Sequence, residues 1–117
     1  MKVVCYPKCG TCKKALAYLE KLEIKYDYRD IKLENPSYEE LKDWYEKSGL
    51  EIKRFFNTSG QLYKSMELKD KLPQMSDEEK LQLLATDGML VKRPIAIGDD
   101  FVLVGFKENE WDSVFKK

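Results

Sequence analysis

The amino-acid sequence predicts an α/β protein with a mixed four-stranded sheet and a helical insertion between its second and third strands. Three observations support this prediction. A strand, an amphipathic helix and a second strand follow one another at the start, and a hairpin of two apolar strands lies near the end. The segment between these units carries two helix-starting signals. A chain of 117 residues suits one compact domain, which we place at 1–117.

The first unit is a strand, a helix and a second strand. Residues 2–5 are short and Val-rich, as is typical of a strand buried on both faces, and Pro7 ends this run. From about Thr11 to Leu22, apolar residues recur at helical spacing with lysines and glutamates opposite them. Residues 24–30 alternate between apolar and polar, which indicates a strand. Because β-α-β units are right-handed crossovers between parallel strands, we expect the first two strands to be parallel.

The insertion contains two helices that begin with the same signal. Ser37, followed three residues later by a glutamate, forms a capping box for a helix that we expect to end by Gly49. Ser76, with a glutamate at the same spacing, starts a second helix, which we expect Gly88 to close. Between them, residues 63–68 are predicted to form one or two helical turns.

The last unit completes the sheet. Residues 94–97 and 101–104 are apolar strands joined by a Gly-Asp-Asp turn, and residues 109–115 are predicted to form a short terminal helix. A hairpin adds antiparallel strands to the parallel pair, so the sheet is mixed. This order of elements is the thioredoxin-like arrangement.

Composition argues against several functional classes. The chain has 21 Lys plus Arg and 21 Asp plus Glu, so its overall charge gives no sign of a direct nucleic-acid partner or a membrane surface. No apolar run approaches the ~20 residues that cross a bilayer, and the first residues lack a secretory apolar segment. We therefore expect a cytoplasmic protein, and a monomer.

A Cys-x-x-Cys pair, Cys9 and Cys12, stands between the first strand and the first helix, a position typical of a redox motif. Free backbone N–H groups and the positive end of the helix dipole favour the thiolate of Cys9, and Lys13 adds positive charge. Cys12, about one helical turn further on, is placed to attack a mixed disulfide on Cys9 and release the partner reduced. We expect Gly10 to let the backbone turn tightly and keep the sulfur accessible.

The alternatives for this pair are structural thiols or an adventitious metal site. The chain has three cysteines and no histidine, so a four-ligand zinc site lacks ligands, and we expect neither a metal nor a bound cofactor. The third cysteine, Cys5, lies in the first strand, where we expect it to behave as a small core hydrophobe.

Lys92, Arg93 and Pro94 form a second candidate part of the site. In a thioredoxin-like fold, the proline that begins the third strand is usually cis and faces the cysteine pair, and a neighbouring arginine can hold a thiolate or an anionic sulfur species. The alternative is an ordinary proline at a strand start beside a solvated arginine.

With these residues assembled, the chain resembles the Spx/MgsR-like and arsenate reductase (ArsC) family of glutaredoxin-type proteins. The resemblance rests on four motifs: C-G-T-C-K-K-A, D-I-K-L-E-N-P, R-P-I-A-I and V-G-F-K-E-N-E-W. It implies that Cys9 is the nucleophile, that Cys12 closes a redox-active disulfide as in Spx-like members, and that Arg93 lies beside them. Thr11, inside the first motif, and Arg54 are assigned supporting roles.

The chain departs from the arsenate reductases of this family at several positions. Those enzymes carry serine where Cys12 stands and hold the oxyanion with three arginines, of which Arg93 alone clearly remains. The other two positions fall on Asn57, with Arg54 close by, and on Gly105. Each charge-assisted hydrogen bond lost in this way is worth roughly 1.5 to 3 kcal/mol, which counts against arsenate as the substrate.

Two classes of function remain open at this point. The first is a thiol–disulfide oxidoreductase that acts on a protein or small-molecule disulfide and is reduced by a glutathione-like thiol or by thioredoxin. The second is a redox-sensing transcriptional regulator that, like the Spx members the chain resembles, binds RNA polymerase, through its alpha subunit, rather than DNA. Both use the same sulfur chemistry.

Overall fold

The computed structural model describes residues 1–116; Lys117, the last residue of the expected domain, lies outside them. Its four-stranded sheet has the order β2-β1-β3-β4. The strands are β1 (Lys2–Cys5), β2 (Asp27–Asp30), β3 (Ile95–Ile97) and β4 (Val102–Val104). β1 is parallel to β2 and antiparallel to β3, and β3 is antiparallel to β4. The mixed sheet and thioredoxin-like fold predicted from the sequence are confirmed.

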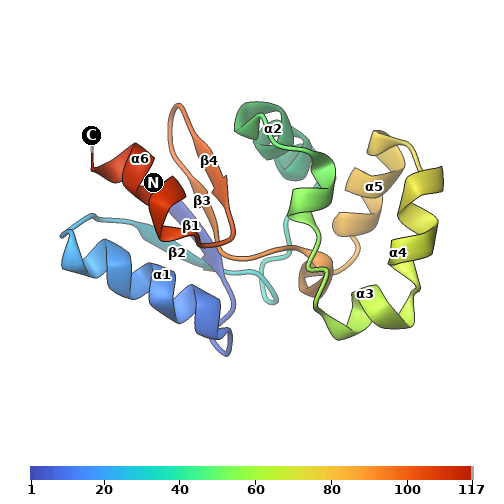
Figure 1. The fold of residues 1–117 in the computed structure, drawn as a ribbon, viewed down its shortest axis with the longest axis horizontal. Coiled ribbons are helices and arrows are strands. Elements are labelled where there is room, and N and C mark those ends of the chain that lie inside the picture. Colours follow the sequence, from blue (N-terminus) through green and yellow to red (C-terminus); the bar gives the residue numbers. More distant parts are fainter. Residues whose placement is uncertain (117) are drawn as a thin grey trace.

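The helices fall into two groups on either side of the sheet. The α-helices are α1 (Gly10–Lys21), α2 (Tyr38–Ser48), α3 (Gln61–Ser65), α4 (Leu68–Lys71), α5 (Asp77–Leu84) and α6 (Glu108–Phe115). Three short 3₁₀ turns are η1 (Ile52–Phe55), η2 (Leu72–Gln74) and η3 (Gly88–Leu90). In Figure 1, α1 and α6 lie together beside the strands, whereas the insertion from α2 to α5 forms a separate helical group.

The sheet separates two apolar clusters, as strand alternation requires. Val3 and Cys5 point to one face, where they pack with Leu19 of α1 and Trp111 of α6. Val4 points to the other face, where the side chains of the insertion cover it. Cys5 therefore lies under α1, on the same side of the sheet as the Cys-x-x-Cys pair.

The local helix signals are confirmed in detail. The Ser37 hydroxyl accepts a hydrogen bond from the Glu40 backbone and the Glu40 carboxylate accepts one from Ser37, and the same box forms at Ser76. Gly49 ends α2 in the left-handed conformation, with φ of 69°. The expected turns over 63–68 are split between α3 and α4.

Two expected boundaries differ from the structure. α5 ends at Leu84, and Gly88 instead begins η3, where a Cβ would lie 2.2 Å from the carbonyl oxygen of Ile31. That glycine serves a close backbone approach and not a helix end. β2 begins at Asp27 because Ile24 closes the turn after α1, its N–H donating to the Leu19 carbonyl.

An ion pair attaches α2 to β2. The Arg29 guanidinium donates two hydrogen bonds to the Glu40 carboxylate, at 2.6 and 2.9 Å. These hydrogen bonds lower the pKa of Glu40 to about 2. The same carboxylate also caps α2, so one side chain links the sheet to the insertion.

Within residues 1–116, no helix is long and apolar enough to cross a membrane. Nor does that part of the chain bring together three or more His, Cys, Asp or Glu side chains in a way that could hold a metal ion.

Candidate functional site

Cys9 and Cys12 occupy the start of α1, as predicted. Cys9 is the N-cap residue, with extended backbone angles (φ −87°, ψ 121°), and its carbonyl accepts a hydrogen bond from the Lys13 N–H at 3.1 Å. Cys12 lies in the first turn and is 1% exposed, whereas Cys9 is half-buried. All three cysteines are unbonded in this structure. Of the pair, Cys9 is the sulfur that an outside disulfide can reach.

The buried sulfur of Cys12 is surrounded by proton donors. Hydrogen bonding by Cys5 is the strongest influence on the pKa of Cys12 and lowers it. Burial opposes this effect, but the Tyr6 backbone N–H, the Cys9 thiol and the positive charge of Arg93 add to it. Together they lower the pKa of Cys12 to about 6. The Tyr6 N–H lies 3.4 Å from the Cys12 Sγ. The surroundings of Cys12 thus favour its thiolate form, and the Cys9 thiol is one of the groups that lower its pKa.

Cys5 has a role beyond the core packing expected of it. Its side chain is fully buried, which confirms the packing prediction. The hydrogen bond to Cys12 is the main cause that raises the pKa of Cys5, and burial is the second. Cys5 therefore stays protonated and donates its S–H hydrogen to Cys12. Strand alternation, which places Cys5 on the α1 side, was the signal that could have predicted this contact.

The Arg93–Pro94 peptide bond is cis, which is one of the two alternatives that the sequence left open. The Arg93 guanidinium lies over the Tyr6 ring, 5.2 Å from its centroid, and Nη1 donates to the Val91 carbonyl at 3.4 Å. Its Nε is buried without a hydrogen-bond partner. Arg93 is therefore held against the protein and is not a freely solvated side chain.

Cys9 and Arg93 line one cleft of about 480 Å³. Thr11, a predicted supporting residue, borders it, and so does Asn57, one of the two positions where the resemblance places an arginine in arsenate reductases. Lys92, the residue before Arg93, is a further lining residue. The structure thus brings the predicted nucleophile and the predicted arginine to the same opening.

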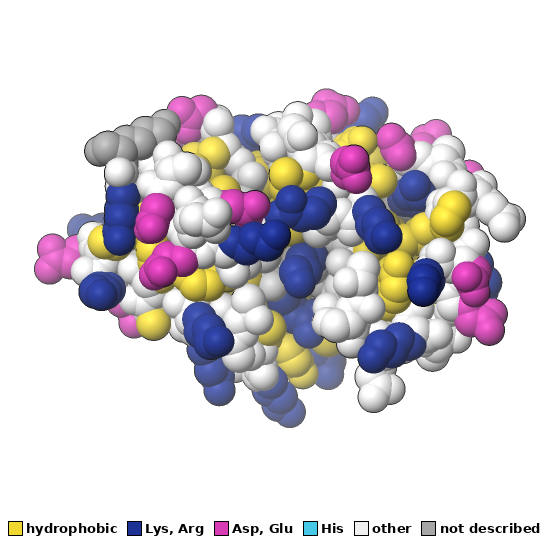
Figure 2. Space-filling model, in the orientation of Figure 1, with side chains coloured by type: hydrophobic (Ala, Val, Ile, Leu, Met, Phe, Trp, Pro, Cys, Tyr) yellow, Lys and Arg dark blue, Asp and Glu magenta, His cyan; other side chains and the backbone are white. Residues whose placement is uncertain are grey.

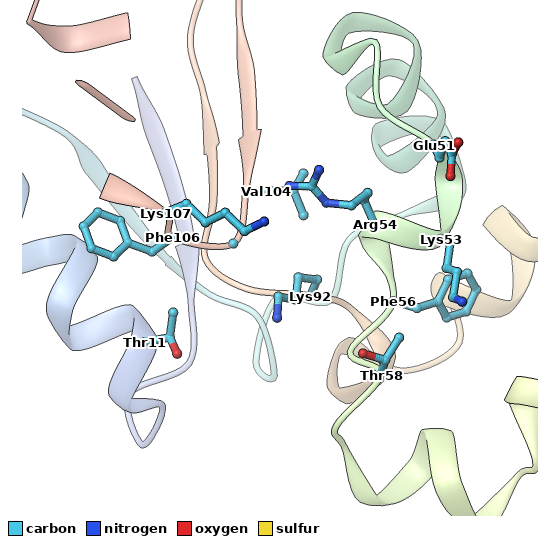
Figure 3. Close-up of a pocket in the computed structure, with 11 residues that line it drawn as sticks. Thr11, Glu51, Lys53, Arg54, Phe56, Thr58, Lys92, Val104, Phe106 and Lys107 are labelled. Atoms are coloured by element: carbon cyan, nitrogen blue, oxygen red, sulfur yellow. The ribbon is translucent and has the colours of Figure 1, made fainter. Parts of the chain in front are cut away.

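Arg54 lines an adjoining space of about 470 Å³, which shares Thr11 and Lys92 with the first. Figure 3 shows Arg54, from the insertion, and Lys107, from the segment before α6, extending toward one another across this space. Gly105, the second position that carries an arginine in arsenate reductases by the resemblance, also lines it.

Three other predicted site residues, Lys13, Pro94 and Gly10, differ in their exposure and in their position in the fold. Lys13 is exposed on α1, and Pro94 is buried immediately before β3. The expectation that Gly10 allows a tight turn is wrong, because Gly10 is the first residue of α1, lacks a positive φ, and has room for a Cβ.

Comparison with known proteins agrees with this geometry. A model of the ArsC family matches residues 5–114. The chain belongs to the ArsC family. The ArsC-related protein whose crystal structure is known from Bacteroides fragilis superposes with a TM-score of 0.94 at 50% identity, covering 97% of this chain and 95% of that one.

Two curated relatives of this ArsC family member extend the comparison. YusI of Bacillus subtilis is 52% identical over 107 residues, which are 92% of this chain and 91% of YusI. The global transcriptional regulator Spx of Enterococcus faecalis is 30% identical over 105 residues, which are 89% of this chain and 77% of Spx. The family includes proteins of different roles, so membership alone identifies a thiol-based redox protein and no single activity.

Proposed function

We propose that this protein is a thiol–disulfide oxidoreductase in which Cys9 attacks and Cys12 resolves. One observation carries the proposal: a half-buried cysteine at the start of α1 stands one helical turn before a second cysteine, which is 1% exposed and whose pKa its surroundings lower. Accessibility suits attack on an outside disulfide, whereas burial protects the second sulfur from any partner except the first.

The reaction proceeds by two exchanges. Cys9 loses its thiol proton, and its Sγ attacks one sulfur of the substrate, forms an S–S bond with that half and releases the other half as a thiolate. The Cys12 thiolate then attacks Cys9 Sγ, closing the Cys9–Cys12 disulfide and expelling the second half. Two electrons pass from the cysteines to the substrate, and the released thiolates take up protons from water. An external reductant, a glutathione-like thiol or thioredoxin, restores the dithiol.

Arg93 supports both exchanges. Its side chain lines the cleft beside Cys9, and its positive charge adds to the hydrogen bonding by Cys5 that lowers the pKa of Cys12. It therefore stabilises negative charge on sulfur at the points where thiolates form or leave. A reducing, cytoplasmic compartment is where such a pair would cycle as a dithiol.

Turnover of a disulfide tests this proposal. Reduction of insulin and of bis(2-hydroxyethyl) disulfide is measured with wild type, Cys9→Ser and Cys12→Ser, supplying in turn a small thiol and thioredoxin. We expect turnover by wild type and none by Cys9→Ser. Absence of turnover by wild type with every reductant would remove the enzyme proposal.

A redox-controlled regulator is the second candidate, and the 30% identity to Spx, a global transcriptional regulator, favours it. In that case the Cys9–Cys12 disulfide would control binding to RNA polymerase through its alpha subunit. A pull-down of that subunit with reduced and with oxidised protein tests this role. Redox-dependent capture without disulfide turnover would favour the regulator over the enzyme.

Arsenate is a less well supported substrate than a disulfide. Asn57 and Gly105 line the two parts of the cleft and carry no charge where the resemblance places arginines, and a cysteine stands in place of the serine. Arsenite formation in the presence of a small thiol would contradict this assessment.

A further inference from the structure

The space beside the cysteine cleft is strongly basic, although the chain as a whole has a formal net charge of +0. Its charged lining residues are four cations and one carboxylate: Lys53, Arg54, Lys92, Lys107 and Glu51. Figure 2 shows Lys and Arg side chains gathered in the middle of this face, between the sheet side and the helical insertion. Such a concentration of one charge in a hollow attracts anions.

These cations are weakly neutralised by the protein itself. Arg54 has a carboxylate partner in Glu110, but the two atoms are 3.5 Å apart and the side chains are 38% and 34% exposed. An ion pair between such exposed side chains contributes little to stability, so a competing anion can replace the carboxylate at Arg54. Lys53 and Lys107 have no ion pair at all among residues 1–116.

The basic space opens next to the sulfur that attacks. It shares Thr11 and Lys92 with the cleft that Cys9 lines, and Thr11 follows Cys9 by two positions in the chain. A small molecule can therefore place a sulfur at Cys9 and a charged group among the cations at the same time. Figure 3 shows Lys107 and Arg54 approaching this space from opposite sides.

We propose that the preferred substrate is a small disulfide with a carboxylate a few bonds from sulfur, which the basic subsite of Lys53, Arg54, Lys92 and Lys107 binds while Cys9 attacks the S–S bond. This inference rests on the proposed oxidoreductase function and specifies its substrate class. The subsite acts on binding and orientation, and the electrons and protons move as in the two exchanges described above.

Three symmetrical disulfides of similar size provide the test: 3,3′-dithiodipropionate (anionic), bis(2-hydroxyethyl) disulfide (neutral) and cystamine (cationic). Each kcat/KM is divided by the rate of the same disulfide with a free model thiol, which removes its intrinsic reactivity. We expect the corrected kcat/KM to be highest for the anionic disulfide, intermediate for the neutral one and lowest for the cationic one. The ratio of the anionic to the neutral value should fall as NaCl is added.

The variant Lys53→Gln/Arg54→Gln/Lys107→Gln should lower the ratio of anionic to neutral kcat/KM by about tenfold, since each partly exposed ion pair contributes a few-fold at most. Lys42→Gln is the matched control, because Lys42 is an exposed lysine of α2 outside both spaces. An unchanged ratio in the triple variant, or an equal fall in Lys42→Gln, would overturn the subsite.

A binding measurement separates failure of the subsite from failure of the oxidoreductase proposal. Calorimetric titration of Cys9→Ser with 3,3′-dithiodipropionate needs no turnover. Binding that is lost in the triple variant supports the subsite even if wild type reduces no disulfide. Turnover of the neutral disulfide without either binding or an anionic preference would overturn the subsite and leave the oxidoreductase intact.

Discussion

The backbone N–H of Tyr6 donates to the Cys12 Sγ over 3.4 Å, from the loop that joins β1 to the start of α1. Together with the Cys5 thiol, it supplies donors to a sulfur that is 1% exposed. A buried thiolate without donors would be costly, so the strand, the loop and the helix together permit charge on Cys12. The resolving step uses that charge.

Replacing Cys5 by valine should raise the pKa of Cys12 toward its ordinary value of 9.0, because hydrogen bonding by Cys5 is the largest influence that lowers it to about 6. The thiolate absorbance of Cys12, titrated in a Cys9→Ala background, measures the shift. Cys5→Ser keeps a donor of similar size and should preserve most of the lowering. Equal pKa values for the valine and serine variants would show that packing alone was changed.

The free energy of unfolding should rise with pH between about 6 and 9.0, because Cys12 is ionised in the folded state and protonated in the unfolded state over that range. The stability that the lowered pKa of Cys12 supplies is fully present above 9.0 and is lost as pH falls through about 6. Above 9.0 stability should fall again, since the raised pKa of Cys5 keeps that buried thiol protonated while the unfolded chain ionises.

Urea unfolding of the reduced protein at several pH values measures both slopes. Cys12→Ala should remove the rise between pH 6 and 9.0 that is assigned to Cys12. A slope that survives in Cys12→Ala would mean that another group is responsible.

Glu40→Gln should cost about 1 kcal/mol of unfolding free energy at neutral pH, a value reduced for the partial exposure of the Arg29–Glu40 pair, whose side chains are 12% and 33% exposed. The lowered pKa of Glu40 supplies stability above 4.5 that is lost as pH falls through about 2, so wild type and variant should converge in acid. Glu39→Gln, an exposed neighbour in the first turn of α2, is the control. If the difference in unfolding free energy between wild type and Glu40→Gln did not change with pH, the loss of stability would be assigned to the helix cap and not to the ion pair.

The parts of the fold that local signals determine were predicted well. The capping boxes at Ser37 and Ser76 fix two helix starts within a few residues of chain, and alternation fixes which side of β1 faces α1. Gly88 was assigned wrongly because a close approach to Ile31, distant in sequence, determines its role. A sequence does not distinguish a glycine that ends a helix from a glycine that lets a distant carbonyl group approach the backbone.

The site was predicted in part for the same reason. Cys9, Cys12 and Arg93 belong to short motifs, so the sequence identified them, whereas Cys5 becomes a donor only when β1 packs beneath α1. The basic subsite includes Lys53 and Lys107, which line one space only because the insertion packs against the sheet. No local pattern carries that information.

The division of roles between Cys9 and Cys12 is tested most directly by trapping the mixed disulfide. Cys9→Ser and Cys12→Ser are exposed to bis(2-hydroxyethyl) disulfide, and intact mass with peptide mapping follows the adduct over time. Rapid, persistent addition at Cys9 in Cys12→Ser, with slow addition at the buried Cys12 in Cys9→Ser, is the predicted result. Faster addition at Cys12 than at Cys9 would contradict it.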